Sequence, residues 1–148
     1  MRILLQRVRG GRVSVQGTLL AEIGKGLVVL VGVGPEDSQE EVRWLAKKCA
    51  TLRIFEDSNG LTNLSLQDVQ GEALVVSQFT LYADVRKGRR PSFIRAAKPE
   101  IAEPLVKLFA EALETHGVPT RIGEFGAHML VEINNDGPMT IILEREPQ

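Results

Sequence analysis

The first third of the chain places apolar residues in short runs and alternations that are typical of β-strands. Residues 3–8 are mostly apolar, and residues 12–16 alternate strictly between polar and apolar positions. Two more apolar runs cover residues 19–23 and 27–33, with a Gly-Lys-Gly turn signal between them. Because these runs follow one another too closely for parallel crossovers, we expect antiparallel hairpins.

A helical period begins after this region. Asp37 or Ser38 can cap a helix, and apolar residues at positions 42, 45, 46, 49 and 52 then recur three and four residues apart. That spacing gives one apolar face, which includes Cys49, the only cysteine of the chain. We therefore assign Cys49 to core packing rather than to catalysis.

A second helix is expected over residues 99–115, with Gly117 as its stop signal. Pro104 lies inside this stretch, so the pattern predicts either a kink or a start near Glu103. The side chains expected to face inward are Ile101, Leu105, Leu108, Phe109, Ala112 and Leu113.

The remaining segments complete a mixed pattern. Residues 72–82 form a strong strand signal, residues 61–71 look irregular, and residues 120–123, 128–134 and 139–143 are expected to be closing strands. The order of strands, helix, strand, helix and strands indicates one α+β domain over residues 1–148, not a repeating βαβ chain.

Composition narrows the class of protein. The 148 residues are the size of one ordinary domain, and 43% are hydrophobic. Eighteen basic and nineteen acidic residues give a net charge of −1, which excludes a globally basic nucleic-acid binder but not a local basic patch. One cysteine rules out an intramolecular disulfide framework. The longest apolar stretch is too short to span a membrane and the first residues lack a signal-peptide pattern, so a cytoplasmic protein is expected.

Familiar catalytic motifs are missing. The chain has no phosphate-binding Gly-x-x-x-x-Gly-Lys loop, no Gly-x-Ser-x-Gly elbow and no His-Glu-x-x-His zinc helix. Gly32-Val33-Gly34 lacks the third glycine of a dinucleotide fingerprint, so we interpret it as a strand end. We interpret His116 and His128 as structural or surface residues. Although Glu132 would share a strand face with His128, two potential ligands do not make a metal site.

Ser77-Gln78-Phe79-Thr80 places polar side chains inside an otherwise apolar strand. On a strand, Ser77 and Phe79 would face one side, and Gln78 and Thr80 the other. Because buried hydroxyls and amides are costly unless they are hydrogen-bonded, this stretch either joins strands of a sheet or lines a site.

Two further stretches carry polar or basic residues. Residues 134–138, Asn-Asn-Asp-Gly-Pro, have the composition of a polar hairpin turn. Residues 86–98 hold six basic residues and no acidic one: Arg86, Lys87, Arg89, Arg90, Arg95 and Lys98. Such a patch in a chain of nearly zero net charge fits phosphate binding, and a solvated loop is the alternative.

Taken together, these stretches resemble the D-aminoacyl-tRNA deacylase family over essentially the whole chain. The resemblance is carried by the opening Met-Arg-Ile-Leu-Leu-Gln-Arg-Val, by residues 77–81, by the Lys-Gly-Arg-Arg-Pro-Ser-Phe of residues 87–93, and by the Asn, Asp, Gly, Pro, Met and Thr at 134 and 136–140. Each motif is weak alone, but their order within 148 residues is highly specific.

The resemblance implies a carboxylic ester hydrolase that releases D-amino acids, and misattached glycine, from tRNA. It implies a barrel-like, mainly antiparallel sheet with two flanking helices, and a homodimer whose active sites lie at the interface. It implies no cofactor, no metal, no DNA partner and no membrane partner.

The family's functional residues carry over to specific positions. By resemblance, Ser77, Gln78, Phe79 and Thr80 line the pocket for the terminal adenosine and the ester. Gly137-Pro138 resembles an element that enters the partner's pocket and rejects L-aminoacyl esters, and Arg7 resembles the residue that orients it. Our own inference assigns the tRNA acceptor-stem phosphates to the basic stretch that contains Arg86, Lys87, Arg89, Arg90 and Arg95.

Two other classes of function are compatible with parts of the sequence. A non-catalytic RNA-binding module would use the basic stretch but has no need of residues 77–80. An esterase for small acyl substrates would use residues 77–80 but not the basic stretch. Salt dependence separates them, because tRNA binding weakens steeply as salt rises.

Overall fold

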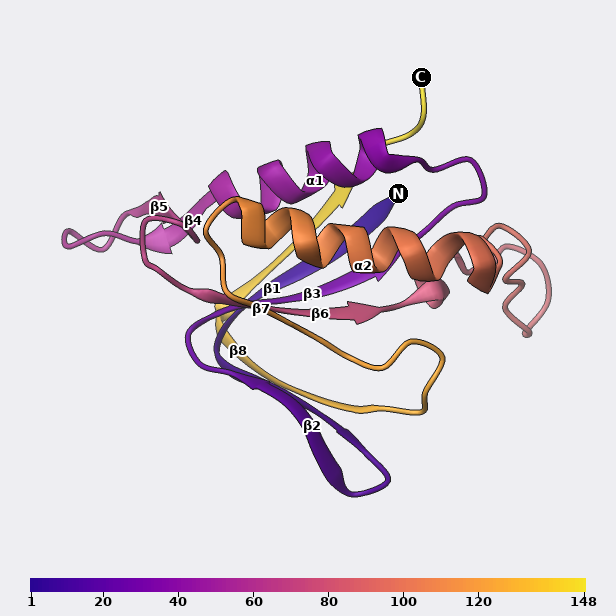
Figure 1. The fold of residues 1–148 in the computed structure, drawn as a ribbon, viewed down its shortest axis with the longest axis horizontal. Coiled ribbons are helices and arrows are strands. Elements are labelled where there is room, and N and C mark those ends of the chain that lie inside the picture. The colour runs from indigo at the N-terminus through magenta and orange to yellow at the C-terminus, as the bar shows by residue number, and fades with distance from the viewer.

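The computed structural model describes residues 1–148 and shows one strongly curled sheet with two helices on one face (Figure 1). The sheet strands are β1 (Arg2–Val15), β2 (Thr18–Ile23), β3 (Gly26–Gly32), β6 (Glu72–Ser77), β7 (Thr120–Ile122) and β8 (Leu130–Glu144). The helices are α1 (Gln39–Thr51) and α2 (Pro99–Thr115), and a 3-10 helix, η1 (Phe79–Tyr82), follows β6. A separate hairpin pairs β4 (Arg53–Glu56) with β5 (Thr62–Ser65).

The strand order β2-β1-β3-β6-β7 combines two kinds of pairing. β1 pairs antiparallel with β2, β3 and β8, which confirms antiparallel pairing at the start of the chain and the hairpin of β1 with β2. The expected hairpin of β2 with β3 is wrong, because β1 lies between them: its first half pairs with β3 and its second half with β2. β3 pairs with β6, and β6 with β7, in parallel, and α2 lies in the crossover between β6 and β7. The α+β class with a mainly antiparallel, barrel-like sheet and two helices is therefore confirmed.

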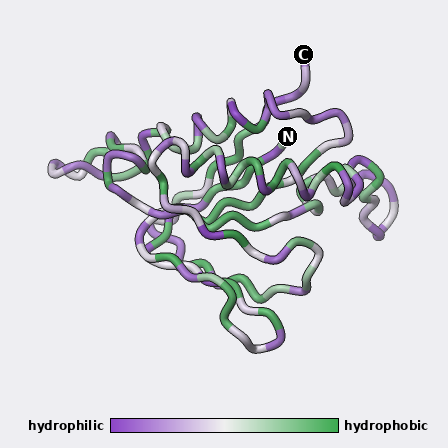
Figure 2. Tube along the Cα trace, viewed as in Figure 1, coloured by the Kyte–Doolittle hydropathy of each residue, from purple (hydrophilic) through white to green (hydrophobic).

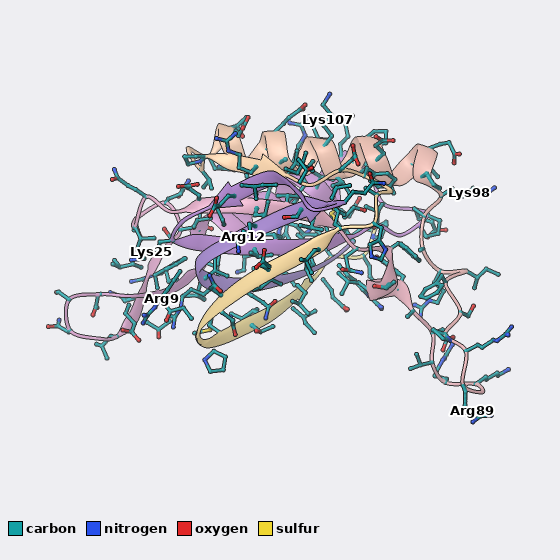
Figure 3. The ribbon with its side chains drawn as sticks, turned by 90° about the horizontal axis from the view of Figure 1, so that it is seen from below. Arg9, Arg12, Lys25, Arg89, Lys98 and Lys107 are labelled. Atoms are coloured by element: carbon teal, nitrogen blue, oxygen red, sulfur yellow. The ribbon has the colours of Figure 1, made fainter.

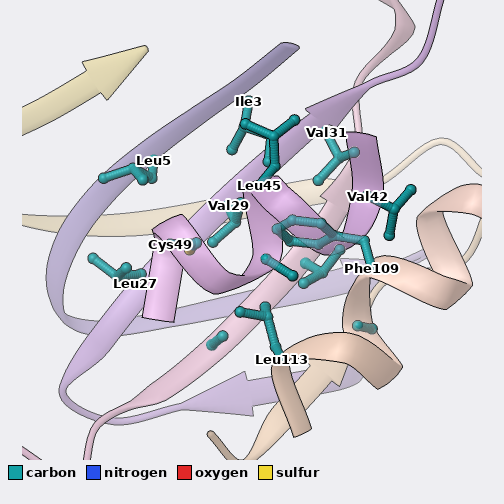
Figure 4. Packing of buried hydrophobic residues seen from close by; sticks show 14 of the residues in the cluster. Ile3, Leu5, Leu27, Val29, Val31, Val42, Leu45, Cys49, Phe109 and Leu113 are labelled. Carbon is teal, nitrogen blue, oxygen red and sulfur yellow. The ribbon is translucent and has the colours of Figure 1, made fainter. Parts of the chain in front are cut away.

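The sheet buries residues on both faces. A cluster of 24 buried residues lies between the sheet and the two helices (Figure 4). A second cluster of seven residues fills the curl of the sheet, where Ala21 and Ile23 of β2 pack with Leu74 and Val76 of β6. Both faces of β3 and β6 are thus covered, which explains their continuous apolar runs (Figure 2).

Both predicted helices are confirmed, and the second has the predicted bounds. Ser38 caps α1 in a capping box with Glu41, whereas Asp37 accepts hydrogen bonds from the backbone of Gly34 and the α-amino group of Met1. Cys49 is fully buried in the core, and burial raises the pKa of its thiol to about 12. No helix of the structure has the length and apolar character needed to cross a membrane.

The second helix corrects two details. It begins at Pro99 and continues through Pro104, so the alternative start near Glu103 is wrong. Of the residues expected to face inward, Phe109 and Leu113 are fully buried, and Leu105, Leu108 and Ala112 are partly buried against the core. The buried face also takes in Ala102, Val106 and Ala110, which were not predicted. Ile101, expected inside, is 39% exposed.

Three local predictions fail where tertiary pairing decides the structure. Residues 61–71, expected to be irregular, contain β5. Residues 3–8 and 12–15 belong to a single long strand, β1, and Gln16 lies in the turn that follows it. Residues 128–134 and 139–143 are not separate strands around a hairpin turn, because most of both stretches lies in β8, which runs along β1 from Leu130 to Glu144.

Candidate active site

A cavity of about 610 Å³ opens where β3 and β6 end. Its walls come from the ends of both strands, from η1, from the first turn of α2 and from the segment that precedes β8. The lining residues are Val31, Val33, Val76, Ser77, Gln78, Phe79, Phe93, Ala96, Ala97, Lys98, Pro99, Ala102, Phe125, Gly126, Ala127, His128, Met129 and Val131. Most of them are apolar, as expected of a pocket that excludes water around a few polar groups.

The polar stretch at residues 77–80 leaves the sheet instead of continuing the strand. Ser77 pairs with Val31 as the last residue of β6, and the Gln78 amide donates to the Val31 carbonyl at 2.8 Å. Beyond this point β3 has ended and offers no partner, so the chain turns into η1. The predicted alternation of faces along residues 77–80 is therefore wrong.

The turn nevertheless brings most of this stretch to one cavity. Ser77, Gln78 and Phe79 line it, and Phe79 is 53% exposed. Thr80 is exposed and does not line the cavity, but its hydroxyl accepts a hydrogen bond from the side-chain amide of Gln78. The hydroxyl of Thr80 thus faces an amide donor and not a general base.

The ionisable side chains that line the cavity are Lys98 and His128. No motif marked the segment that carries His128, and the sequence interpretation gave it a structural or surface role. Glu132, its proposed neighbour on a strand, is instead held by Arg12 across β1 and β8, with Nε to Oε2 at 2.5 Å. This hydrogen bond lowers the pKa of Glu132. The structure contains no grouping of three or more His, Cys, Asp or Glu residues suited to hold a metal.

The basic stretch forms an exposed loop beside the cavity. Arg89 lies at the outer tip of this loop, and Lys98 lies where it meets α2 (Figure 3). Arg86 is paired with Asp84, just outside the stretch, and hydrogen bonds from Arg86 hold the pKa of Asp84 well below its usual range. The other basic residues, Lys87, Arg89, Arg90, Arg95 and Lys98, are exposed and make no salt bridge.

An aromatic contact connects the loop to the cavity. Phe93 lies within the basic stretch and lines the cavity, and its ring meets Phe79 edge-on, with centroids 5.1 Å apart at 77°. Aromatic pairs prefer this geometry. A ligand that contacts the loop and the cavity would therefore span one continuous surface.

Arg7 and Gly137-Pro138 meet outside the cavity, where β1 pairs with β8. Here β8 bulges away from β1, because Gln6 pairs with Thr140 whereas Val8 pairs with Asn135. The bulge contains a cis Gly137–Pro138 peptide bond, and both residues are exposed. Neither lines the cavity of its own chain.

The side chain of Arg7 holds this bulge in place. It is 8% exposed; Nε donates to the carbonyl of Asp136 at 3.0 Å, and Nη1 donates to the carbonyl of Ile54 at 2.8 Å. Gly137 has a φ of +133°, and a Cβ there would lie 2.8 Å from Nη2 of Arg7. The guanidinium therefore packs directly against Gly137.

Known proteins resemble this chain over nearly its full length. A family model described as D-Tyr-tRNA(Tyr) deacylase matches residues 4–144. A D-aminoacyl-tRNA deacylase of Thermomicrobium roseum is 61% identical over 97% of this chain and 94% of its own, and one of Desulfatibacillum aliphaticivorans is 56% identical over 97% and 99%.

Two solved structures share the fold. One, described as c-Myc DNA Unwinding Element Binding Protein, aligns with a TM-score of 0.92 and 41% identity over 99% of this chain and all of its own. Another, described as a probable eukaryotic D-amino acid tRNA deacylase, aligns with a TM-score of 0.82 over 96% of this chain and 97% of its own. At 19% identity, the second match shows the fold alone.

Proposed function

The chain belongs to the D-Tyr-tRNA(Tyr) deacylase family, and we propose that it hydrolyses the ester between a D-amino acid and the 3′ end of tRNA. The observation that carries this proposal is the cavity walled by Ser77, Gln78 and Phe79 and joined to an exposed basic loop through Phe93. The cavity takes the aminoacyl end, and the loop lies within reach of backbone phosphates. We place this activity in the cytoplasm, where aminoacyl-tRNA is used. Release of D-tyrosine from D-tyrosyl-tRNA is the direct test.

The reaction needs positioning more than a strong nucleophile, because an aminoacyl ester is already activated. We propose that water attacks the ester carbonyl: a C–O bond to water forms, the bond to the ribose oxygen breaks, and a proton passes to that oxygen. The 2′-hydroxyl of the tRNA helps to orient the water, and the backbone N–H groups of Phe79 and Thr80 stabilise the developing oxyanion. The products are free tRNA and a D-amino acid.

Thr80 is expected to have a positioning role, through its hydrogen bond with Gln78, and not to form a covalent intermediate. An activated threonine needs a nearby base, and its hydroxyl here meets the Gln78 amide. In a single turnover with D-tyrosyl-tRNA, mass spectrometry of the quenched protein should therefore show only the unmodified chain. A tyrosyl adduct on Thr80 would overturn water attack.

Chiral selection is assigned to Gly137-Pro138. The exposed bulge is fixed by Arg7 but does not reach its own cavity. We therefore propose a homodimer in which Gly137-Pro138 of each subunit enters the cavity of the other. Exposed apolar side chains on β2 and β8 support a protein interface: Leu19, Leu20, Leu130 and Ile142.

This arrangement explains selectivity by exclusion. Rigid backbone beside the substrate Cα collides with an L side chain, whereas a D side chain points away from it. Exclusion places no demand on the identity of the D side chain. Glycine has no side chain to collide, so glycyl-tRNA is proposed as a further substrate.

The basic loop is expected to contribute to tRNA affinity. Replacing both Arg89 and Arg90 with alanine should raise KM several-fold with little change in kcat, because phosphate binding adds affinity without touching the ester. The slope of log(kcat/KM) against log salt should become shallower by roughly 1 for each phosphate that is no longer neutralised. Lys107→Ala, an exposed lysine on α2, is the matched control (Figure 3).

The salt dependence of kcat/KM also tests the two alternative functions, a small-ester esterase and a non-catalytic RNA-binding module. A small-ester esterase would show kinetics that barely respond to salt or to the loop variants. An RNA-binding module would bind tRNA with the same salt dependence but leave the ester intact. Either result would contradict the deacylase proposal.

A further inference from the structure

The turn that carries the cavity wall is not held by burial of its own residues. None of the four residues of η1 is fully buried. Its backbone is tied to the sheet at its start, where the Gln78 amide meets Val31, and at Leu81, whose carbonyl accepts from Arg2 Nη1 at 3.1 Å. What packs against its last residue, Tyr82, therefore decides how firmly the turn is fixed.

The Gly32-Val33-Gly34 motif provides the surface on which Tyr82 packs. Alternate residues of an extended chain face opposite sides, and Val33 points into the buried core. On the other side, a Cβ at Gly32 would lie 3.3 Å from Cδ2 of Tyr82, and one at Gly34 would lie 3.0 Å from its hydroxyl. Side chains at these two positions would push the ring away, so the two glycines explain the close fit.

Charged groups hold the ring from the remaining sides. The guanidinium of Arg2 lies over the ring, 4.7 Å from its centroid, and Arg2 Nε pairs with Glu144 at 3.0 Å. The side chain of Asp37 is buried and receives the Gly34 amide at 2.6 Å. Burial, and then the negative charge of Asp37, raise the pKa of Tyr82, so the hydroxyl beside Asp37 stays protonated.

We propose that Tyr82 is a positioning residue for the candidate active site: packed on Gly32 and Gly34 and held by Arg2 and Asp37, it fixes η1 so that Gln78 and Phe79 keep their place in the cavity wall. The inference rests on the proposed deacylase function for its kinetic consequence. Its structural consequence, a firmly held η1, does not depend on that function.

The test compares Tyr82→Leu, Tyr82→Phe and the wild-type protein. Tyr82→Leu removes the ring and should lower kcat for D-tyrosyl-tRNA by roughly 10- to 100-fold, the scale expected for misplaced reacting groups, with KM nearly unchanged. Tyr82→Phe keeps the ring and should therefore retain most of the wild-type kcat. Trp44→Leu is the matched control, because Arg145 lies over its ring at 5.0 Å but Trp44 is on α1 and does not line the cavity.

Hydrogen exchange supplies a readout that does not require activity. The backbone N–H groups of Leu81 and Ala83 donate the hydrogen bonds that close the turn, to the carbonyls of Gln78 and Thr80. Both should exchange faster in Tyr82→Leu and remain at the wild-type rate in Trp44→Leu. If Tyr82→Leu fails to fold, Gly34→Ala carries the test, because its Cβ would lie 3.0 Å from the Tyr82 hydroxyl and press on the ring while Tyr82 remains.

The outcomes distinguish the two claims. An active wild-type enzyme whose Tyr82→Leu variant keeps kcat and slow exchange overturns the positioning role. A wild-type protein that leaves D-tyrosyl-tRNA intact overturns the proposed function, and the exchange of Leu81 and Ala83 then decides alone whether Tyr82 holds η1. A kcat loss equal in Tyr82→Leu and Trp44→Leu would show general destabilisation and also overturn the inference.

Discussion

Replacing Arg7 with alanine is expected to weaken the discrimination between D- and L-tyrosyl-tRNA by roughly tenfold or more, equal to about 1.4 kcal/mol of lost selectivity. The buried guanidinium joins the carbonyls of Asp136 and Ile54 and packs against Gly137. Without it the bulge can move and admit an L side chain. The ratio of kcat/KM for the two esters measures this effect.

Arg9 provides a matched control on the same strand. Its Nε also reaches Asp136, at 3.3 Å, but the side chain is 84% exposed. Exposed pairs contribute little, so Arg9→Ala should retain wild-type selectivity. Arg7→Lys tests the same point in a milder way, because lysine keeps the charge but lacks the planar fork that reaches two carbonyls. An unchanged D-to-L ratio in folded Arg7→Ala and Arg7→Lys would count against the role of the bulge.

Replacing Gly26 with alanine is expected to cause the largest loss of stability, about 4 kcal/mol or more in the free energy of unfolding. A Cβ at Gly26 would lie 1.8 Å from the carbonyl oxygen of Glu72, its partner on β6. That oxygen is part of the backbone and cannot rotate away, so β3 and β6 would have to separate where their parallel pairing begins. Urea unfolding measures the change.

Gly24→Ala is the control for this prediction. A Cβ at Gly24 meets only the side-chain oxygen of Glu72, at 3.9 Å, which is an ordinary contact. Its unfolding free energy should stay within about 0.5 kcal/mol of wild type. Equal stability of Gly26→Ala and Gly24→Ala would show that the two strands are less closely packed than the structure has them.

Elements whose pattern is local could be predicted from the sequence. The second helix has the predicted bounds, Pro99 to Thr115, because its amphipathic period and its glycine stop signal lie within the segment itself. Ser38 caps the first helix for a similarly local reason, the reciprocal capping box with Glu41. Which residues at the margins of the apolar face are buried was harder to predict, since the face that α2 presents depends on α1 and the sheet.

Elements that depend on a distant partner were predicted wrongly. The apolar alternation continues through Phe79 and Leu81, yet β6 ends at Ser77 because its neighbour β3 ends. The Gly and Pro of residues 134–138 have the composition of a turn, but the long pairing with β1 absorbs them as a bulge in β8. No pattern within either segment carries that information.

The candidate site shows the same division. The polar stretch at residues 77–80 and the basic loop stand out in the sequence, and the structure places them beside one cavity. The wall that contains His128 and Met129 has no motif, and it reaches the cavity only because of how the chain runs into β8. The packing surface for Tyr82 is likewise visible in the sequence only as Gly32-Val33-Gly34, which the pattern identifies as a strand end and not as a contact for a distant ring.

Hydrolysis of matched D-tyrosyl- and L-tyrosyl-tRNA by the purified protein, with a chelator present, tests the central claim most directly. We expect rapid release of D-tyrosine and none of L-tyrosine, at a rate that the chelator does not change. Equal hydrolysis of both esters would contradict the proposed exclusion of L side chains by Gly137-Pro138, and failure to cleave either ester would contradict the assignment of the cavity as a deacylase site.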